Sequence, residues 1–90
     1  MVKRAKLEIM RDILKIIEEN KNSIKPTPLL RKSGLSSKGF KEYYLEFLNR
    51  KLITEQVIGK QEKKVSLTEK GFKFLDRYNT IKDFIEEFDL

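Results

Sequence analysis

The sequence lacks cysteine and histidine. Without cysteine there is no disulfide framework and no thiolate nucleophile, and without both residues a zinc site of the usual ligand types is excluded. Histidine-based acid–base catalysis is excluded as well. Glycine is scarce, with 4 residues, and no glycine-rich phosphate loop is present. The remaining carboxylates and hydroxyls have no recognisable catalytic spacing. We therefore expect a protein that is not an enzyme, with no cofactor, no metal and no evident small-molecule substrate.

Long hydrophobic runs are also lacking. No apolar stretch is long enough to cross a bilayer, so no membrane partner is expected. The opening MVKRAKLEIMRD is basic, but Glu8, Arg11 and Asp12 interrupt any signal-peptide core. A chain of 90 residues is expected to form one domain, and we predict that it is cytoplasmic.

Positive charge is abundant and unevenly distributed. The chain has 20 Lys and Arg against 14 Asp and Glu, a net charge of +6. Residues 1–67 contain 16 basic and 8 acidic side chains, hence +8, and residues 68–90 contain 4 and 6, hence −2. Abundant Lys and Glu are also typical of thermophilic proteins. A basic body beside a mildly acidic tail nevertheless favours a polyanionic partner for the body alone.

The first half of the chain predicts two helices with an isolated apolar residue between them. A short second helix is expected at 28–33, with Thr27 as its N-cap, Pro28 in its first position and Gly34 at its end. The isolated apolar residue is Ile24, before this helix, and a single such residue can form only a bridge-length strand. The first helix has one apolar stripe at helical spacing, made of Leu7, Met10, Ile13, Leu14 and Ile17.

A third helix is predicted in the segment LSSKGFKEYYLEFLNRKLI, over residues 36–50, with Ser36 as N-cap. Its aromatic-rich stripe follows the helical period, which favours a place in the core over a surface on which bases stack. The members of this stripe are Phe40, Tyr43, Tyr44, Phe47 and Leu48.

A hairpin and a last helix follow. Residues 52–58 are rich in β-branched side chains, and Val65 and Leu67 alternate with a polar residue, so two strands are expected around a turn at Gly59. Thr68 is the expected N-cap of a helix that runs from about residue 69 nearly to the end.

A short helix, a glycine-containing turn, an amphipathic helix and then a hairpin form a winged helix-turn-helix. We predict an α+β fold, mostly α, in which residues 1–68 are the winged helix-turn-helix and residues 69–90 are a dimerisation helix packed on it. Lysines gather at the hairpin tip, residues 59–64, which places them where a wing can touch phosphates.

The segments LSSKGFKEYYLEFLNRKLI, VSLTEKGFKFL and KLEIMRDIL resemble an archaeal winged-helix protein, and most closely the archaeal 10-kDa DNA-binding family. The resemblance covers residues 6–88. It implies a DNA-binding winged helix with a C-terminal helix that dimerises as a coiled coil, and a chromatin or nucleoid-associated role. Many relatives have glycine before the LI that opens the wing, where this chain has Lys51.

Candidate contacts with duplex DNA follow from the motif, because the N-terminal part of the second helix meets the bases. This part has no Arg for guanine and no Asn or Gln for adenine, so we expect weak sequence preference and affinity mainly from phosphates. Lys38 and Glu42, four residues apart, could instead be a solvated ion pair. The candidate DNA-binding residues are Ser36, Ser37, Lys38, Lys41, Glu42, Lys60, Lys63 and Lys64.

Other basic residues have two interpretations. Lys3, Arg4 and Lys6 form either an N-terminal arm on the DNA backbone or a disordered, solubilising tail. Arg50 and Lys51 at the end of the third helix either contact phosphates or offset the helix dipole.

The last helix has apolar residues in steps of 4, 3, 4 and 3, which is a heptad pattern and predicts a homodimer. These candidate dimerisation residues are Phe74, Tyr78, Ile81, Ile85 and Phe88.

The predicted function is therefore a dimeric duplex DNA-binding protein that acts as a transcriptional regulator or a nucleoid-associated protein. The rival hypothesis is a winged helix that binds another protein and no DNA, which Glu42 and Glu46 favour because they would repel phosphates.

Overall fold

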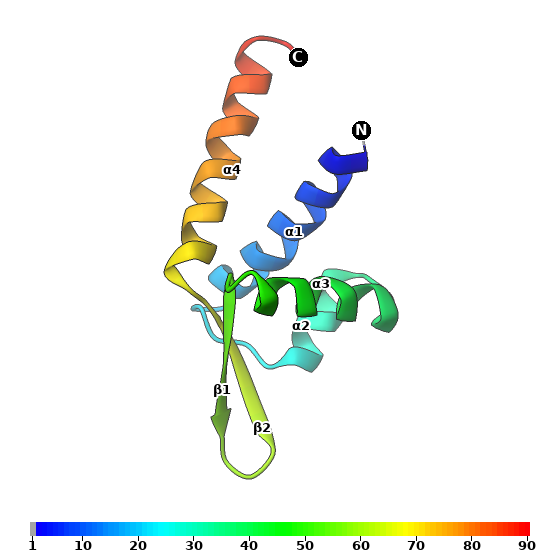
Figure 1. Cartoon of the computed structure of the whole chain (residues 1–90), viewed down its shortest axis with the longest axis vertical. Coiled ribbons are helices and arrows are strands. Elements are labelled where there is room, and N and C mark those ends of the chain that lie inside the picture. Colours follow the sequence, from blue (N-terminus) through cyan, green and yellow to red (C-terminus); the bar gives the residue numbers. More distant parts are fainter. Residues whose placement is uncertain (1) are drawn as a thin grey trace.

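The structure is a computed structural model that describes residues 2–90, and the side chains of residues 6–90. Three helices are followed by an antiparallel hairpin and a fourth helix, which confirms the predicted α+β, mostly α, winged-helix fold. Helices α1 and α4 diverge from a common base, while the hairpin extends in the opposite direction (Figure 1). The elements are α1 (Val2–Glu19), α2 (Pro26–Ser33), α3 (Ser37–Asn49), β1 (Ile53–Ile58), β2 (Glu62–Leu67) and α4 (Glu69–Glu87).

The core lies where α1, α2, α3 and the base of the hairpin meet. Four residues of the predicted α1 stripe are buried, whereas Leu7 at its N-terminal end is 40% exposed. Phe47 of α3 is fully buried and Phe40 nearly so, which confirms that the aromatic stripe faces the core. The buried apolar residues are Met10, Ile13, Leu14, Ile17, Ile24, Leu29, Phe40, Phe47, Leu52, Ile53, Val65, Leu67 and Leu75.

The hairpin is joined to the helices by a third, one-residue strand. β1 and β2 pair in register from Ile53 opposite Leu67 to Ile58 opposite Glu62. The amide of Ile24 donates to the carbonyl of Val65 at 3.1 Å, and the amide of Val65 donates back at 2.7 Å. The predicted bridge-length strand at Ile24 is therefore confirmed, and it holds the base of the wing against the loop before α2.

Helix α2 begins two residues earlier than predicted. Pro26, not Pro28, is the first residue of the helix, and Lys25 is the N-cap without a side-chain hydrogen bond. The expected cap at Thr27 is therefore wrong. The amide of Leu29 donates to the carbonyl of Lys25 at 3.1 Å, so the helical bonding already includes residue 25. The predicted end at Gly34 is confirmed, with a left-handed φ of 73°.

The caps of α3 and α4 agree with the sequence. The Ser36 hydroxyl accepts from the amide of Gly39, and the Thr68 hydroxyl accepts from the amide of Gly71, both at 3.1 Å. Thr68 also donates to the carbonyl of Lys51 at 2.6 Å, which ties the start of α4 to the turn before β1. Lys51 itself has a φ of 60°, in the left-handed region that favours the glycine of the family it resembles.

Gly71 is required by a close approach of two backbones. A Cβ at this position would lie far inside van der Waals contact with the Leu52 carbonyl oxygen. Gly71→Ala should therefore lower the free energy of unfolding by about 1–3 kcal/mol, the usual cost of overpacking, in spite of the better helix propensity of alanine. Gly39→Ala is the matched control, because its Cβ would meet only the Ser36 hydroxyl, at 3.3 Å, and no backbone atom. Urea unfolding followed by circular dichroism measures both; equal midpoints for the two variants would contradict the close approach.

Candidate nucleic-acid interface

The N-terminal end of α3 presents a polar, exposed surface. Ser36, Ser37, Lys38, Lys41 and Glu42 are all exposed, and the same helix turns Phe40 and Phe47 inward. The helix begins at Ser37, so its free amide groups and the positive end of its dipole lie among these side chains. A phosphate or the edge of a base can therefore approach this end of α3 without displacing any core residue.

Lys38 and Lys41 carry charge that the fold leaves available. Among the described side chains, residues 6–90, no acidic group lies within ion-pair distance of either ammonium group. The alternative in which Lys38 and Glu42 form an ion pair across one helical turn is therefore not the arrangement of this structure. Both lysines are available to an external anion.

The wing turns at residues 59–61, with Gly59 at a φ of 76°. Lys60 is exposed at this turn. Lys63 pairs with Val57 and Lys64 with Gln56 across the hairpin, and adjacent residues of a strand point to opposite faces. The three predicted wing lysines are therefore divided between the turn and both faces of the hairpin.

Glu55 links the wing to α3. Its carboxylate accepts a hydrogen bond from the Tyr44 hydroxyl of α3 and lies 3.9 Å from the Lys63 ammonium group of β2. Burial and this hydrogen bond raise the pKa of Tyr44 above its usual value. Part of the Lys63 charge is therefore offset inside the protein, and the Tyr44–Glu55 hydrogen bond, which sequence analysis did not find, joins α3 to β1 of the wing.

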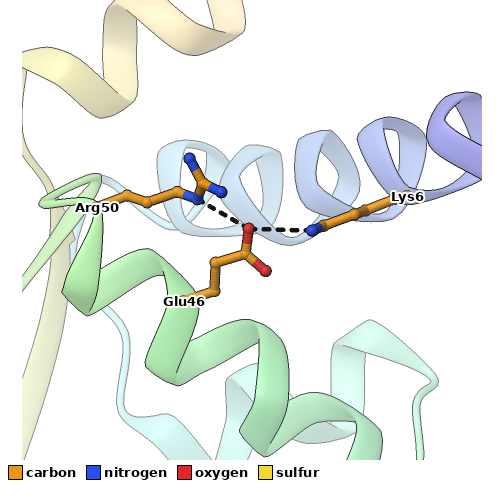
Figure 2. Close-up of polar contacts among 3 residues, drawn as sticks. All are labelled: Lys6, Glu46 and Arg50. Carbon is orange, nitrogen blue, oxygen red and sulfur yellow. Dashed lines mark hydrogen bonds and ion pairs between the residues drawn. The ribbon is translucent and has the colours of Figure 1, made fainter.

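Glu46 lies between two cations on the side of α3 that faces α1. Its carboxylate is 3.2 Å from the Lys6 ammonium group of α1 and 2.8 Å from the Arg50 Nε at the end of α3 (Figure 2). Burial raises the pKa of Glu46, but the hydrogen bonds and charges of Lys6 and Arg50 outweigh that effect, so its pKa is held below the usual value. Glu46 therefore does not present an unpaired negative charge to DNA, which removes the basis of the expectation that it repels the DNA backbone.

The predicted N-terminal arm is a helix. The backbone from Val2 onward belongs to α1, and Lys6 reaches Glu46. The side chains of Lys3 and Arg4 lie outside the described part of the chain. Arg50, a second candidate for phosphate contact, is engaged by the same carboxylate.

The five candidate dimerisation residues of α4, called the α4 seam below, are half-covered at the start of the helix and exposed toward its end. Phe74 packs against the core, and Tyr78 lies beneath the Arg11 guanidinium of α1 at 5.2 Å from the ring centre. Ile81 and Phe88 are 55% and 57% exposed. Phe84, beside the seam, is 54% exposed and contacts Phe88 with the two rings tilted by 45° and their centres 4.8 Å apart. Such a row of exposed apolar side chains is typical of a surface that binds another protein.

The described part of the chain has neither a cluster of metal ligands nor a helix suited to a membrane. Among the side chains of residues 6–90 no three metal-ligating groups converge. No helix within residues 2–90 has both the length and the hydrophobicity needed to span a bilayer.

Comparison with known proteins places the chain among winged helices. The model of the winged helix-turn-helix family matches residues 3–86. A search of curated proteins finds no match. Among solved structures the chain is similar to Sso10a-2, a DNA-binding protein from Sulfolobus solfataricus, with 20% identity, a TM-score of 0.75, and 91% and 82% of the two chains covered.

Two further solved structures have the same fold. MepR, a transcription regulator of the Staphylococcus aureus multidrug efflux pump MepA, has 16% identity and a TM-score of 0.75 over 88% of this chain. The match spans 59% of the length of MepR. AF1382 from Archaeoglobus fulgidus has 22% identity and a TM-score of 0.67, with 89% and 86% of the two chains covered.

Proposed function

Because the chain belongs to the winged helix-turn-helix family, we propose that it binds duplex DNA and acts as a transcriptional regulator or a nucleoid-associated protein. The observation that carries this proposal is the pair of exposed cationic surfaces, at the start of α3 and on the wing, on a body with a net charge of +8. The printed descriptions of Sso10a-2 as DNA-binding and of MepR as a transcription regulator support it.

In the proposed complex the first turns of α3 lie in the major groove. Lys38, Lys41 and Glu42 face the base edges, while the amides next to Ser36 and Ser37 receive a phosphate oxygen. None of these side chains makes the bidentate contacts by which Arg reads guanine or Asn reads adenine. Affinity therefore comes mainly from phosphates, and sequence preference is weak.

In the proposed complex the wing supplies further contacts with the DNA, on the phosphates beside the major groove. Lys60 and Lys64 approach the flanking phosphates without an internal partner among the described residues, and Lys63 contributes less because Glu55 offsets it. The hydrogen bond from Tyr44 of α3 to Glu55 of β1 joins the wing to the recognition helix, which supports a complex in which both surfaces meet one duplex.

The rival function, a winged helix that binds another protein instead of DNA, loses one of its two supports. Glu46 is turned toward α1 and paired there, which leaves Glu42 as the only acidic residue of the proposed contact set. We retain the DNA-binding proposal for this reason, with no enzymatic role.

We also propose that the protein is a homodimer joined by the α4 seam, as in the 10-kDa family that it resembles. Residues 1–68 would then form the DNA-binding unit and residues 69–90 the dimerisation helix. The support for the dimer is the apolar surface of α4 around Ile81, Phe84 and Phe88, which the described part of one chain leaves exposed.

Fluorescence anisotropy of a labelled duplex at several salt concentrations tests the function. The wild-type protein should bind at low salt and lose affinity steeply as salt rises. Lys38→Ala should reduce the log–log salt slope by about 0.9 for its lost phosphate contact and leave the melting temperature unchanged, because the side chain is exposed. Lys82→Ala, an exposed lysine on α4, is the control and should retain wild-type binding. If the wild-type protein fails to bind any duplex at low salt, the proposed function is wrong.

A further inference from the structure

A groove runs between α1 and α4, at the base of the angle that the two helices form in Figure 1. It consists of two adjoining cavities of about 410 and 330 Å³, called the α1–α4 groove below. The two cavities share the apolar residues Leu7, Leu52 and Phe74 and one cation, Lys70. Pockets that bind small molecules typically have volumes of roughly 300–1,000 Å³, so each cavity is large enough for one.

The floor of the α1–α4 groove is apolar. Met10 and Leu52 are buried residues of the larger cavity, whereas Leu7 is 40% exposed although it belongs to the α1 stripe that faces the core. Phe74, on the first turns of α4, is only partly buried. The phosphate backbone of a duplex has no apolar surface to cover such a floor. We therefore expect an occupant that is not DNA and that has an apolar body.

The rim of the α1–α4 groove is cationic. The only carboxylate that lines either cavity is that of Glu46, and Lys6 and Arg50 already pair with it. Five basic side chains surround the two cavities, hence +4 with Glu46 included, so a negatively charged occupant fits the rim. These five are Lys6, Arg50, Lys70, Lys73 and Arg77.

Two of these cations are available to an external anion. Lys70 forms no ion pair with any of the described side chains. Arg50 bonds to Glu46 through its Nε at 2.8 Å, so its two terminal nitrogens can still donate to a carboxylate (Figure 2). Both residues line the larger cavity, beside Leu7 and Met10. Available cations and exposed apolar surface therefore meet in one depression.

We propose that the larger cavity of the α1–α4 groove binds a small organic anion, a medium-chain aliphatic carboxylate. Its carboxylate accepts from the Lys70 ammonium group and from the terminal nitrogens of Arg50, which are charge-assisted hydrogen bonds. Its chain covers Leu7, Leu52 and Phe74. The bound anion thus contacts α1, the end of α3 and the start of α4 at once.

This site is separate from the proposed DNA-binding surfaces. Arg50 caps the C-terminal end of α3, whereas the proposed contacts with DNA lie at its N-terminal end and on the wing. Phe74 is the only residue of the α4 seam that lines the larger cavity. The inference therefore goes beyond the proposed function, and it is tested without a duplex.

Titration of octanoate into the full chain, below the concentration at which micelles form, tests the inference. Octanoate should shift the NMR signals of the Leu7, Leu52 and Lys70 amides and leave those of the wing unchanged. Calorimetry of hexanoate, heptanoate and octanoate should give binding that tightens about 3-fold with each CH2, because each CH2 buries further apolar area. Octylamine, which has the same chain length and the opposite charge, should not bind in the groove.

Two variants test the residues. Lys70→Gln should weaken octanoate binding about 5-fold, the upper range for one partly solvated ion pair, and leave the melting temperature unchanged because the side chain is exposed. Lys82→Gln, which removes a lysine farther along the same helix, is the matched control and should bind octanoate as the wild type does. Leu7→Asp should abolish binding, because it places a carboxylate on the apolar floor.

Three results would overturn the inference. Octylamine that binds as tightly as octanoate would show adsorption through the chain alone. Equal octanoate affinities for Lys70→Gln and Lys82→Gln would show that the cations of the groove do not hold the carboxylate. Amide shifts confined to the exposed apolar residues Phe84 and Phe88 would place the ligand elsewhere on α4. DNA binding is measured in a separate anisotropy titration, so none of these results depends on whether the protein binds a duplex.

Discussion

Replacement of Lys60, Lys63 and Lys64 together by alanine should weaken duplex binding on the order of 100-fold at 0.1 M salt. A cation that neutralises one phosphate contributes about 0.9 to the log–log salt slope, so two full contacts contribute about 1.8, which is close to two orders of magnitude in affinity at this salt concentration. The loss should be the same for unrelated duplex sequences, because phosphates carry no sequence information. Anisotropy titrations over a range of salt concentrations measure both the affinity and the slope.

The three lysines should not contribute equally. Lys63 lies 3.9 Å from Glu55, whose carboxylate offsets part of the lysine charge inside the protein. Lys60→Ala/Lys64→Ala should therefore account for most of the change in slope. Lys15→Ala, on α1, is the control and should bind as the wild type does. A triple variant with an unchanged salt slope would contradict the place of the wing on the phosphates.

Local signals in the sequence were sufficient to predict most of the helices and strands. Ser36 and Thr68 cap helices because their hydroxyls accept from amides three residues later, which is a contact within one turn. The start of α2 was mispredicted because both of its prolines suit the first helical turn. The choice between Pro26 and Pro28 depends on where Ile24 is bound to Val65, which is a contact between distant parts of the chain.

The candidate site was predictable only in part, because some of its contacts also join distant parts of the chain. The helical period of α3 indicates that Lys38 and Lys41 face away from Phe47, and the structure has them exposed. Arg50 lies four residues after Glu46, within local reach, but the second partner, Lys6, could not be predicted. It lies 40 residues earlier in the chain and meets Glu46 only when α1 packs beside α3. Charges that local patterns leave free can therefore be neutralised by tertiary contacts.

Ile81→Asp should convert the dimer to a monomer and reduce DNA affinity. Ile81 is 55% exposed in the single chain, so a carboxylate at this position is solvated in the monomer and the fold should keep its melting temperature. In the dimer the same carboxylate would be buried at the centre of the α4 seam without a partner, which costs several kcal/mol. Sedimentation velocity at tens of micromolar protein measures the change in mass.

The loss of DNA affinity follows from the loss of bivalent contact. In a two-fold dimer the second α3 binds at the high effective concentration that the first contact creates, so a monomer should bind a long duplex by 10- to 100-fold more weakly. A short duplex that holds only one α3 should bind both forms equally. Asn79→Asp adds the same charge on the same helix outside the seam and is the matched control. A wild-type protein that sediments as a monomer would refute the dimer, and an Ile81→Asp variant that stays dimeric would show that the α4 seam does not join the two copies.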